Sequence, residues 1–256
     1  MTRAVRWGSA LLLVLLGLPS SARAQVVQSV QFGVGYFSPR GFDGRATGDV
    51  WVANLSQPDV LPGVSGSLEF AIGDFRMWNM FGEWNVAFGD RIEASGGTGY
   101  YRRTVNSRYR DLVNSARGNA DINQDLKLRT IPITGLVRFM PFGKAGSAQP
   151  YVGVGVTAVN FRYIESGEFV DPSDFTIFCA GTVGCPNPKY LATGTAVGPV
   201  LLGGVRLPVG GDIYAFTIEG RYHMVQGKTG GGASGFLGEK LDLGGFTFNM
   251  GVLVRF

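Results

Sequence analysis

Eight segments of the chain alternate between bulky apolar and small or polar positions with a period of two residues, the pattern of a β-strand whose two faces meet different surroundings. In the last segment Phe246, Phe248 and Met250 share one face, and Thr247 and Asn249 share the other. Helical periodicity is nearly absent, so the pattern predicts an all-β chain. The segments are 27–38, 66–73, 78–89, 126–140, 150–163, 196–208, 213–225 and 244–256.

The joins between these segments alternate between long and short. The long joins are 39–65, 90–125, 164–195 and 226–243, and the short ones are 74–77, 141–149 and 209–212. All long joins then lie at one end of the strands and all short joins at the other. This layout predicts an eight-stranded antiparallel up-and-down β-barrel. A further alternating stretch, 49–55, leaves ten strands open as an alternative.

Alternation alone does not decide which face points outward, because a soluble lipocalin-like barrel has the same pattern with its apolar face inside. Composition favours a membrane barrel. Charged residues are 16% of the chain, against about 25% in ordinary soluble domains, and of the five lysines only Lys127 lies in a predicted strand. Apolar bands of five or six alternate residues fit spanning strands of about 9–11 residues. Aromatic residues near strand ends, as in interfacial girdles, are Tyr36, Trp78, Trp84, Tyr214 and Tyr222.

Residues 1–24 have the layout of a secretory signal: the basic Arg3 and Arg6, an apolar run at 10–18, and Ala22 and Ala24 as an A-x-A cleavage site. We therefore expect a signal peptide over 1–24 and a barrel domain over 25–256. Removing the signal takes away three arginines and no acid, so the net charge falls from +4 to +1. A general electrostatic case for nucleic-acid binding does not survive this change, and we expect no nucleic-acid partner.

The strand pattern, and the final strand in particular, resembles the small outer-membrane barrels of Gram-negative bacteria: the OmpA transmembrane domain, OmpX and OmpW. In that family a last strand ending in Phe is recognised by the barrel-assembly machinery. The residues that match this assembly signal are Phe248, Met250, Val252, Val254 and Phe256. The resemblance implies the outer membrane as the location, with outer-membrane lipid, lipopolysaccharide and the assembly machinery as partners of a monomer.

Strand parity places seven charged residues on the inward faces: Glu69, Glu83, Arg138, Arg206, Glu219, Arg221 and Arg255. An eight-stranded barrel is just wide enough for its side chains to fill it. Arginine and carboxylate groups confined there are expected to pair in bidentate fashion. The sequence favours a structural polar core, and a gated narrow pore is the alternative.

Enzymatic activity has little support in the sequence. His223 is the single histidine, and it lies on the inward face. The chain is also similar to lipid A deacylase, another small outer-membrane barrel, whose His-x-Ser motif would place the nucleophile at position 225, where this chain has Val225. We therefore expect no enzyme, with no catalytic residue, cofactor or metal site.

Two features fall in the predicted long joins. Cys179 and Cys185 suit a disulfide in an exported protein, with free thiols as the alternative. The stretch 100–110 mixes tyrosine with arginine, and its guanidinium groups could meet lipopolysaccharide phosphates, although a solvated loop or strand extension fits equally well.

These observations predict a non-enzymatic outer-membrane barrel whose function lies in its four surface loops, in structural support, adhesion or surface interaction. A narrow OmpW-like channel for small or hydrophobic solutes is the alternative.

Overall fold

A computed structural model describes residues 26–40, 69–170, 176–209, 211, 213–230 and 240–256. The expected signal peptide and the stretch 49–55 lie outside the described residues. Eight long strands form one closed antiparallel ring in which each strand pairs with its neighbours in sequence, and the first pairs with the last. The eight strands are β1 (Val26–Pro39), β2 (Met77–Phe88), β3 (Ile92–Asn114), β4 (Ala120–Phe139), β5 (Gln149–Val170), β7 (Tyr190–Val209), β8 (Tyr214–His223) and β11 (Gly245–Arg255).

Short strands and 3-10 helices lie at one end of this ring. β6 (Ile177–Ala180) pairs with the end of β5, and β9 (Gln226–Lys228) pairs with β10 (Lys240–Asp242). The 3-10 helices are η1 (Ile72–Phe75) and η2 (Ser115–Arg117). None of the helices in the described part of the chain is long and apolar enough to cross a bilayer.

The eight-stranded ring confirms the predicted fold, and the third predicted segment, 78–89, corresponds to β2, but the second predicted strand, 66–73, and the loop predicted at 90–125 were wrong. Residues 69–76 hold no long strand, and the supposed turn at 74–77 overlaps η1. The expected long join at 90–125 is mostly strand, because it contains all of β3 and the beginning of β4. The count stays at eight because one strand was lost and another gained.

In β3, the strand that the sequence pattern missed, the two faces differ little in the size and polarity of their side chains. In the first half of β3 the outward residues include Ala94 and Gly96, and the inward residues include Ser95 and Gly97. Between Ile92 and Tyr100 neither face carries the bulky apolar side chains that define the other strands. By contrast, Phe70 and Ile72 gave residues 66–73 an apolar appearance because Phe70 is buried in a core at one end of the barrel and Ile72 packs against that core.

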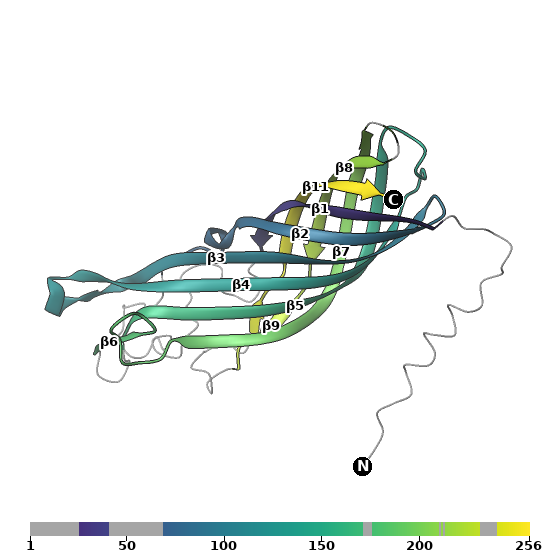
Figure 1. Cartoon of the computed structure of the whole chain (residues 1–256). Coiled ribbons are helices and arrows are strands. Elements are labelled where there is room, and N and C mark those ends of the chain that lie inside the picture. The colour runs from purple at the N-terminus through teal and green to yellow at the C-terminus, as the bar shows by residue number, and fades with distance from the viewer. Residues whose placement is uncertain (1–25, 41–68, 171–175, 210, 212, 231–239) are drawn as a thin grey trace, which may run out of the picture.

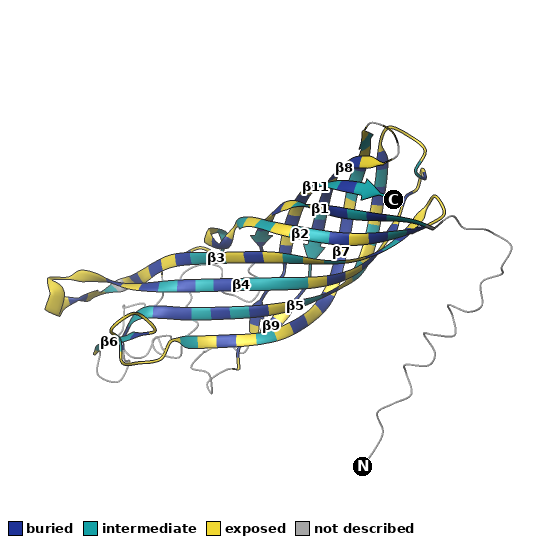
Figure 2. Ribbon diagram, in the orientation of Figure 1, coloured by how far each residue is buried: buried dark blue, intermediate teal, exposed yellow. Residues whose placement is uncertain are grey.

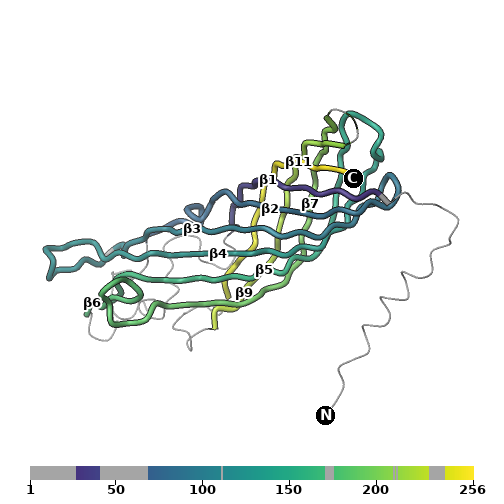
Figure 3. The backbone as a smooth tube through the Cα atoms, viewed as in Figure 1, coloured from purple at the N-terminus to yellow at the C-terminus, as the bar shows by residue number. Residues whose placement is uncertain are grey.

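The barrel has two distinct ends (Figure 1). At the termini end, β1 begins and β11 finishes. At the opposite end, here called the hairpin end, β3 and β4 continue as a two-stranded hairpin past the other strands. Figure 3 shows the backbone of this hairpin running beyond the rest of the ring. Gly118 and Asn119, with φ of 72° and 63°, form its tight turn.

Buried and exposed positions alternate along the strands, as Figure 2 shows, but the chemical character of the outward residues changes along the length of a strand. In β4 the outward residues of the termini half are apolar: Ile131, Ile133, Gly135, Val137 and Phe139. In the hairpin half they are polar: Asp121, Asn123, Asp125, Lys127 and Arg129. The inward residues change in the opposite sense, since Ile122, Leu126 and Leu128 are buried there. The hairpin half therefore has polar residues outside and apolar residues inside, as a water-soluble barrel does. The sequence pattern did not predict this change along the strands.

Candidate functional site: the apolar wall and the charged core

An apolar band surrounds the outer wall of the termini half. Bulky side chains such as Met80, Val154 and Phe216 are 68%, 58% and 54% exposed, while their neighbours on the opposite face are buried. A run of nine residues, such as 131–139, is about 30 Å long, and a strand tilt of about 40° reduces this to roughly 23 Å of height, close to the ~25 Å apolar band of membrane barrels. A soluble protein rarely exposes so large an apolar surface.

The chain is a transmembrane β-barrel. The predicted orientation is confirmed for the last strands, because Phe216, Phe246 and Phe248 point outward while Thr247 and Glu219 are buried inside. Of the five predicted girdle residues, four are well exposed: Tyr36, Trp78, Trp84 and Tyr214. Tyr36 and Trp78 contact each other edge to face with ring centroids 5.5 Å apart.

A compact network of charges fills the lumen inside this band. Three arginines and three glutamates contribute to it, so its formal charge is zero: Arg138, Arg206, Arg221, Glu83, Glu93 and Glu219. The six side chains come from β2, β3, β4, β7 and β8, and each is almost completely buried.

Arg138 lies at the centre of the network. Its Nη2 donates to Glu83 Oε1 at 2.5 Å and to Glu219 Oε2 at 3.0 Å. Its Nη1 donates to Asn85 Oδ1 at 2.9 Å and to Ser95 Oγ at 2.8 Å. Nη1 also lies 3.4 Å from Glu93 Oε1, so the guanidinium donates to five side chains from three other strands and ties opposite walls of the barrel together.

The other two arginines complete the network. Arg206 grips Glu93 with both terminal nitrogens, and Nη1 lies 2.6 Å from Glu93 Oε2. Arg221 donates to both Glu83 and Glu219. The ring of Tyr151 lies against two of the cations, with its centroid 5.5 Å from Arg138 Cζ and 5.2 Å from Arg206 Cζ.

Small residues on the facing strands make room for these side chains. Gly97 lies opposite Glu83, and an added Cβ there would collide with the Glu83 side chain. Gly204 lies opposite Tyr151, and a Cβ would collide with its ring. The glycine-rich inner face is therefore the complement of a few large polar side chains.

The structure brings five of the seven predicted inward charges into this network and places the other two elsewhere. Glu69 pairs with Arg108 at 2.6 Å, with both side chains half exposed at the hairpin end. Arg255 donates to Gln149 Oε1 at 2.9 Å at the termini end. The sixth member, Glu93, was missed because it lies in the strand that the sequence analysis assigned to a loop. The alternation of apolar Ile92 with charged Glu93 was the one sequence signal that a strand begins there.

Short turns cover the network at the termini end. In the turn between β4 and β5, Lys144 donates from Nζ to the Gly89 carbonyl at 2.9 Å. Burial lowers the pKa of Lys144 from its ordinary value, although nearby Glu93 opposes this change.

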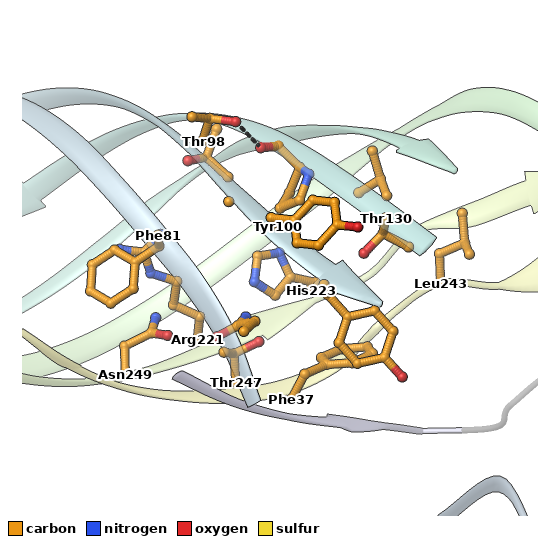
Figure 4. Close-up of a pocket in the computed structure, with 16 residues that line it drawn as sticks. Phe37, Phe81, Thr98, Tyr100, Thr130, Arg221, His223, Leu243, Thr247 and Asn249 are labelled. Atoms are coloured by element: carbon orange, nitrogen blue, oxygen red, sulfur yellow. Dashed lines mark hydrogen bonds between the residues drawn. The ribbon is translucent and has the colours of Figure 1, made fainter. Parts of the chain in front are cut away.

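A cavity of about 60 Å³ lies on the hairpin side of the charged network, between this network and the apolar core of the hairpin end. Figure 4 shows Arg221, His223 and Asn249 among its lining residues, with Phe37 and Leu243 on the apolar side. The predicted inward position of His223 agrees with this placement. Val225, at the position that a nucleophile would need, is buried in the apolar core.

The remaining predicted features lie apart from the charged core. Cys179 and Cys185 are joined as a disulfide with Cα atoms 5.4 Å apart. Residues 100–110 belong to β3 and not to a loop. Phe256, the last residue of the expected assembly signal, contacts Trp84 edge to face, and its N–H donates to the Gln28 carbonyl at 3.0 Å. Among the described residues, no group of three or more His, Cys, Asp or Glu side chains is placed to hold a metal ion.

Comparison with known proteins gives a weak likeness in overall shape. No protein-family model matches the chain. No curated protein matches it. Among solved structures it is similar to Neisserial surface protein A, at 12% identity and a TM-score of 0.43, over 90% of this chain and 96% of that one. It is also similar to the N-terminal β-barrel domain of Pseudomonas aeruginosa OprF, at 10% identity and a TM-score of 0.40, over 90% of this chain and 97% of that one. The outer membrane protein W of E. coli matches at 13% identity and a TM-score of 0.37, over 92% of this chain and all of that one. These matches add no functional residue to this chain.

Proposed function

We propose that the protein is a closed, non-enzymatic barrel of the outer membrane that holds the β3–β4 hairpin and the other hairpin-end segments at the cell surface. The observation that carries this proposal is the charged core. Arg138 has no exposed side-chain surface and is held by Glu83, Glu93 and Glu219. A lumen crossed by such a neutral, hydrogen-bonded network has no path for ions.

The energetics of the network support a permanent seal. Removing one partner of a buried ion pair leaves an uncompensated charge and costs about 3–5 kcal/mol. Opening a pore through the core would separate several such pairs at once. A rigid closed frame is then the state of lowest free energy. The segments at the hairpin end are the part of the protein that interacts with other molecules at the cell surface.

The outer membrane is the proposed location. The apolar band needs a bilayer, and a closed ring of strands satisfies every backbone group within it. The signal-like residues 1–24 and the alternating strand from Phe248 to Phe256 support export and recognition by the barrel-assembly machinery. With the termini end in the periplasm, the hairpin faces outside, and the barrel works as a monomer.

A narrow conduit for small solutes is the second candidate, and the cavity on the hairpin side of the network favours it. A conduit would require the charged core to rearrange, whereas a scaffold does not.

Conductance in planar bilayers distinguishes the two candidates. We expect no steady openings from the wild-type protein, and flickering openings from Glu219→Gln because Arg138 and Arg221 lose a partner. Arg108→Gln, which alters an exposed pair outside the band, is the matched control and should remain silent. Steady wild-type openings that Glu219→Gln abolishes would establish the conduit and overturn the scaffold.

Fractionation tests the location separately. We expect the full chain in the outer-membrane fraction, with a folded form whose migration on a denaturing gel changes on heating. Recovery from a detergent-free soluble fraction would contradict the proposal.

A further inference from the structure

Three arginines form a lateral row on the outer wall of the barrel. Arg102 in β3 lies directly opposite Arg129 in β4, and Arg129 lies directly opposite Arg162 in β5. With strands about 4.8 Å apart, the Cα atoms of the first and last are about 10 Å apart. All three are on the outward face, because the residues beside them, Tyr101, Leu128 and Phe161, are buried inside.

On β3 and β4 the row lies at the level where the outer wall changes from apolar to polar, and on β5 the outward neighbours of Arg162 are Asn160 and Ile164. Toward the termini end, the next outward residues on β3 and β4 are Tyr100 and Ile131, and β4 then continues into the apolar band. Toward the hairpin end, they are Thr104 and Lys127, followed by polar side chains. In a bilayer this level corresponds to the boundary between acyl chains and headgroups.

The charges of the row have no acidic partner among the residues that the structure describes. The acids farther along β4 and β5 toward the hairpin end are already engaged: Asp125 pairs with Lys127 at 3.0 Å, and Glu168 pairs with Arg117 at 2.5 Å. Arg162 Nε is buried and has no hydrogen-bond acceptor within the described part of the chain. Like charges placed directly opposite each other across strands destabilise a sheet, so the row is incomplete without an anion.

We propose that this row binds the phosphate-bearing headgroup of an anionic lipid in the outer leaflet. The guanidinium fork fits phosphate oxygens in bidentate geometry, and the span of the row accommodates more than one phosphate. The adjacent band would receive the acyl chains of the same molecule, which a free phosphate ion lacks. This inference rests on the proposed membrane location and adds a partner to it.

The test uses the full chain refolded in neutral detergent micelles and titrated with three probes: bisphosphorylated lipid A, the same lipid with its phosphates removed, and inorganic phosphate. We expect the dephosphorylated lipid and inorganic phosphate to bind at least tenfold more weakly than lipid A. The triple variant Arg102→Gln, Arg129→Gln, Arg162→Gln should lose at least tenfold in lipid A affinity. A matched triple variant removes three arginines beyond the row, Arg108→Gln, Arg110→Gln and Arg117→Gln, and should change affinity less than twofold.

Thermal unfolding gives a second readout whose sign differs between conditions. In phosphate-free micelles Arg129→Gln relieves repulsion, so its Tm should equal or exceed the wild-type value. With lipid A present, the wild-type Tm should rise more than that of Arg129→Gln. A merely structural role for Arg129 predicts a lower Tm in both conditions.

The inference is overturned if the row variant binds lipid A within twofold of wild type, or if inorganic phosphate or dephosphorylated lipid binds equally well. These results are independent of fractionation. A membrane-located, silent barrel with an unaffected row variant would leave the proposed function standing and remove only the lipid site.

Discussion

At the scale of single residues, the core is organised by how many donors and acceptors each charged side chain can satisfy. Arg138 donates to Glu83, Glu219, Asn85 and Ser95, so its charge is compensated without water. The sequence could supply five members of the network by strand parity. It did not supply Glu93, because parity applies only after a strand has been recognised, and residues 94–99, which follow Glu93, are too small to mark one.

Glu93→Gln should lower the free energy of unfolding by about 3–5 kcal/mol, since Arg206 would lose its carboxylate inside the barrel. Denaturant unfolding in lipid vesicles measures this change. Asp90→Asn, on the exposed turn three residues earlier, is the control and should stay within about 0.5 kcal/mol of wild type. Adding Arg206→Gln to Glu93→Gln should cost less than the sum of the two single changes. Additive losses would show that the pair does not act as a unit.

At the scale of elements, the β3–β4 hairpin differs most from the sequence prediction. Residues 100–110 are polar on the outward face, which suggested a loop, yet Val105 and Tyr109 on the inward face are buried. The strand continues past the membrane with its apolar side turned inward. A pattern search that expects the apolar side chains on one face of the whole strand does not detect such a hairpin. In β4 the apolar residues move from the inward face to the outward face between residues 129 and 131.

Gly118→Val should loosen the tip of this hairpin without opening the ring. Gly118 has φ of 72°, where a β-branched residue is strained by about 1–2 kcal/mol. Limited proteolysis of vesicle-embedded protein should cleave near residues 114–120 several times faster, while the denaturant midpoint of the barrel stays unchanged. Ser115→Ala, in the same turn, should be cleaved at the wild-type rate. An unchanged rate for Gly118→Val would mean that the turn does not hold the hairpin.

At the scale of the whole molecule, the chain combines two kinds of barrel end to end. In the termini half, apolar side chains face lipid and the charges meet inside. In the hairpin half, polar side chains face water and an aromatic core that includes Tyr101, Phe161 and Tyr163 fills the interior. Each half places its apolar surface away from water, and the row of Arg102, Arg129 and Arg162 lies at the boundary between them.

This boundary predicts that the same substitution costs different amounts of folding free energy at two outward positions of one strand. Val154 lies within the apolar band, and Ile164 lies beyond the arginine row. Val154→Lys should cost about 2–4 kcal/mol of folding free energy in vesicles, the cost of a lysine near the bilayer midplane, whereas Ile164→Lys should cost about 0–1 kcal/mol. Denaturant titration of both variants in the same lipid measures the difference. Equal small costs would indicate that water, and not acyl chains, surrounds the band, because only a low-dielectric surrounding penalises the charge at one position and not at the other.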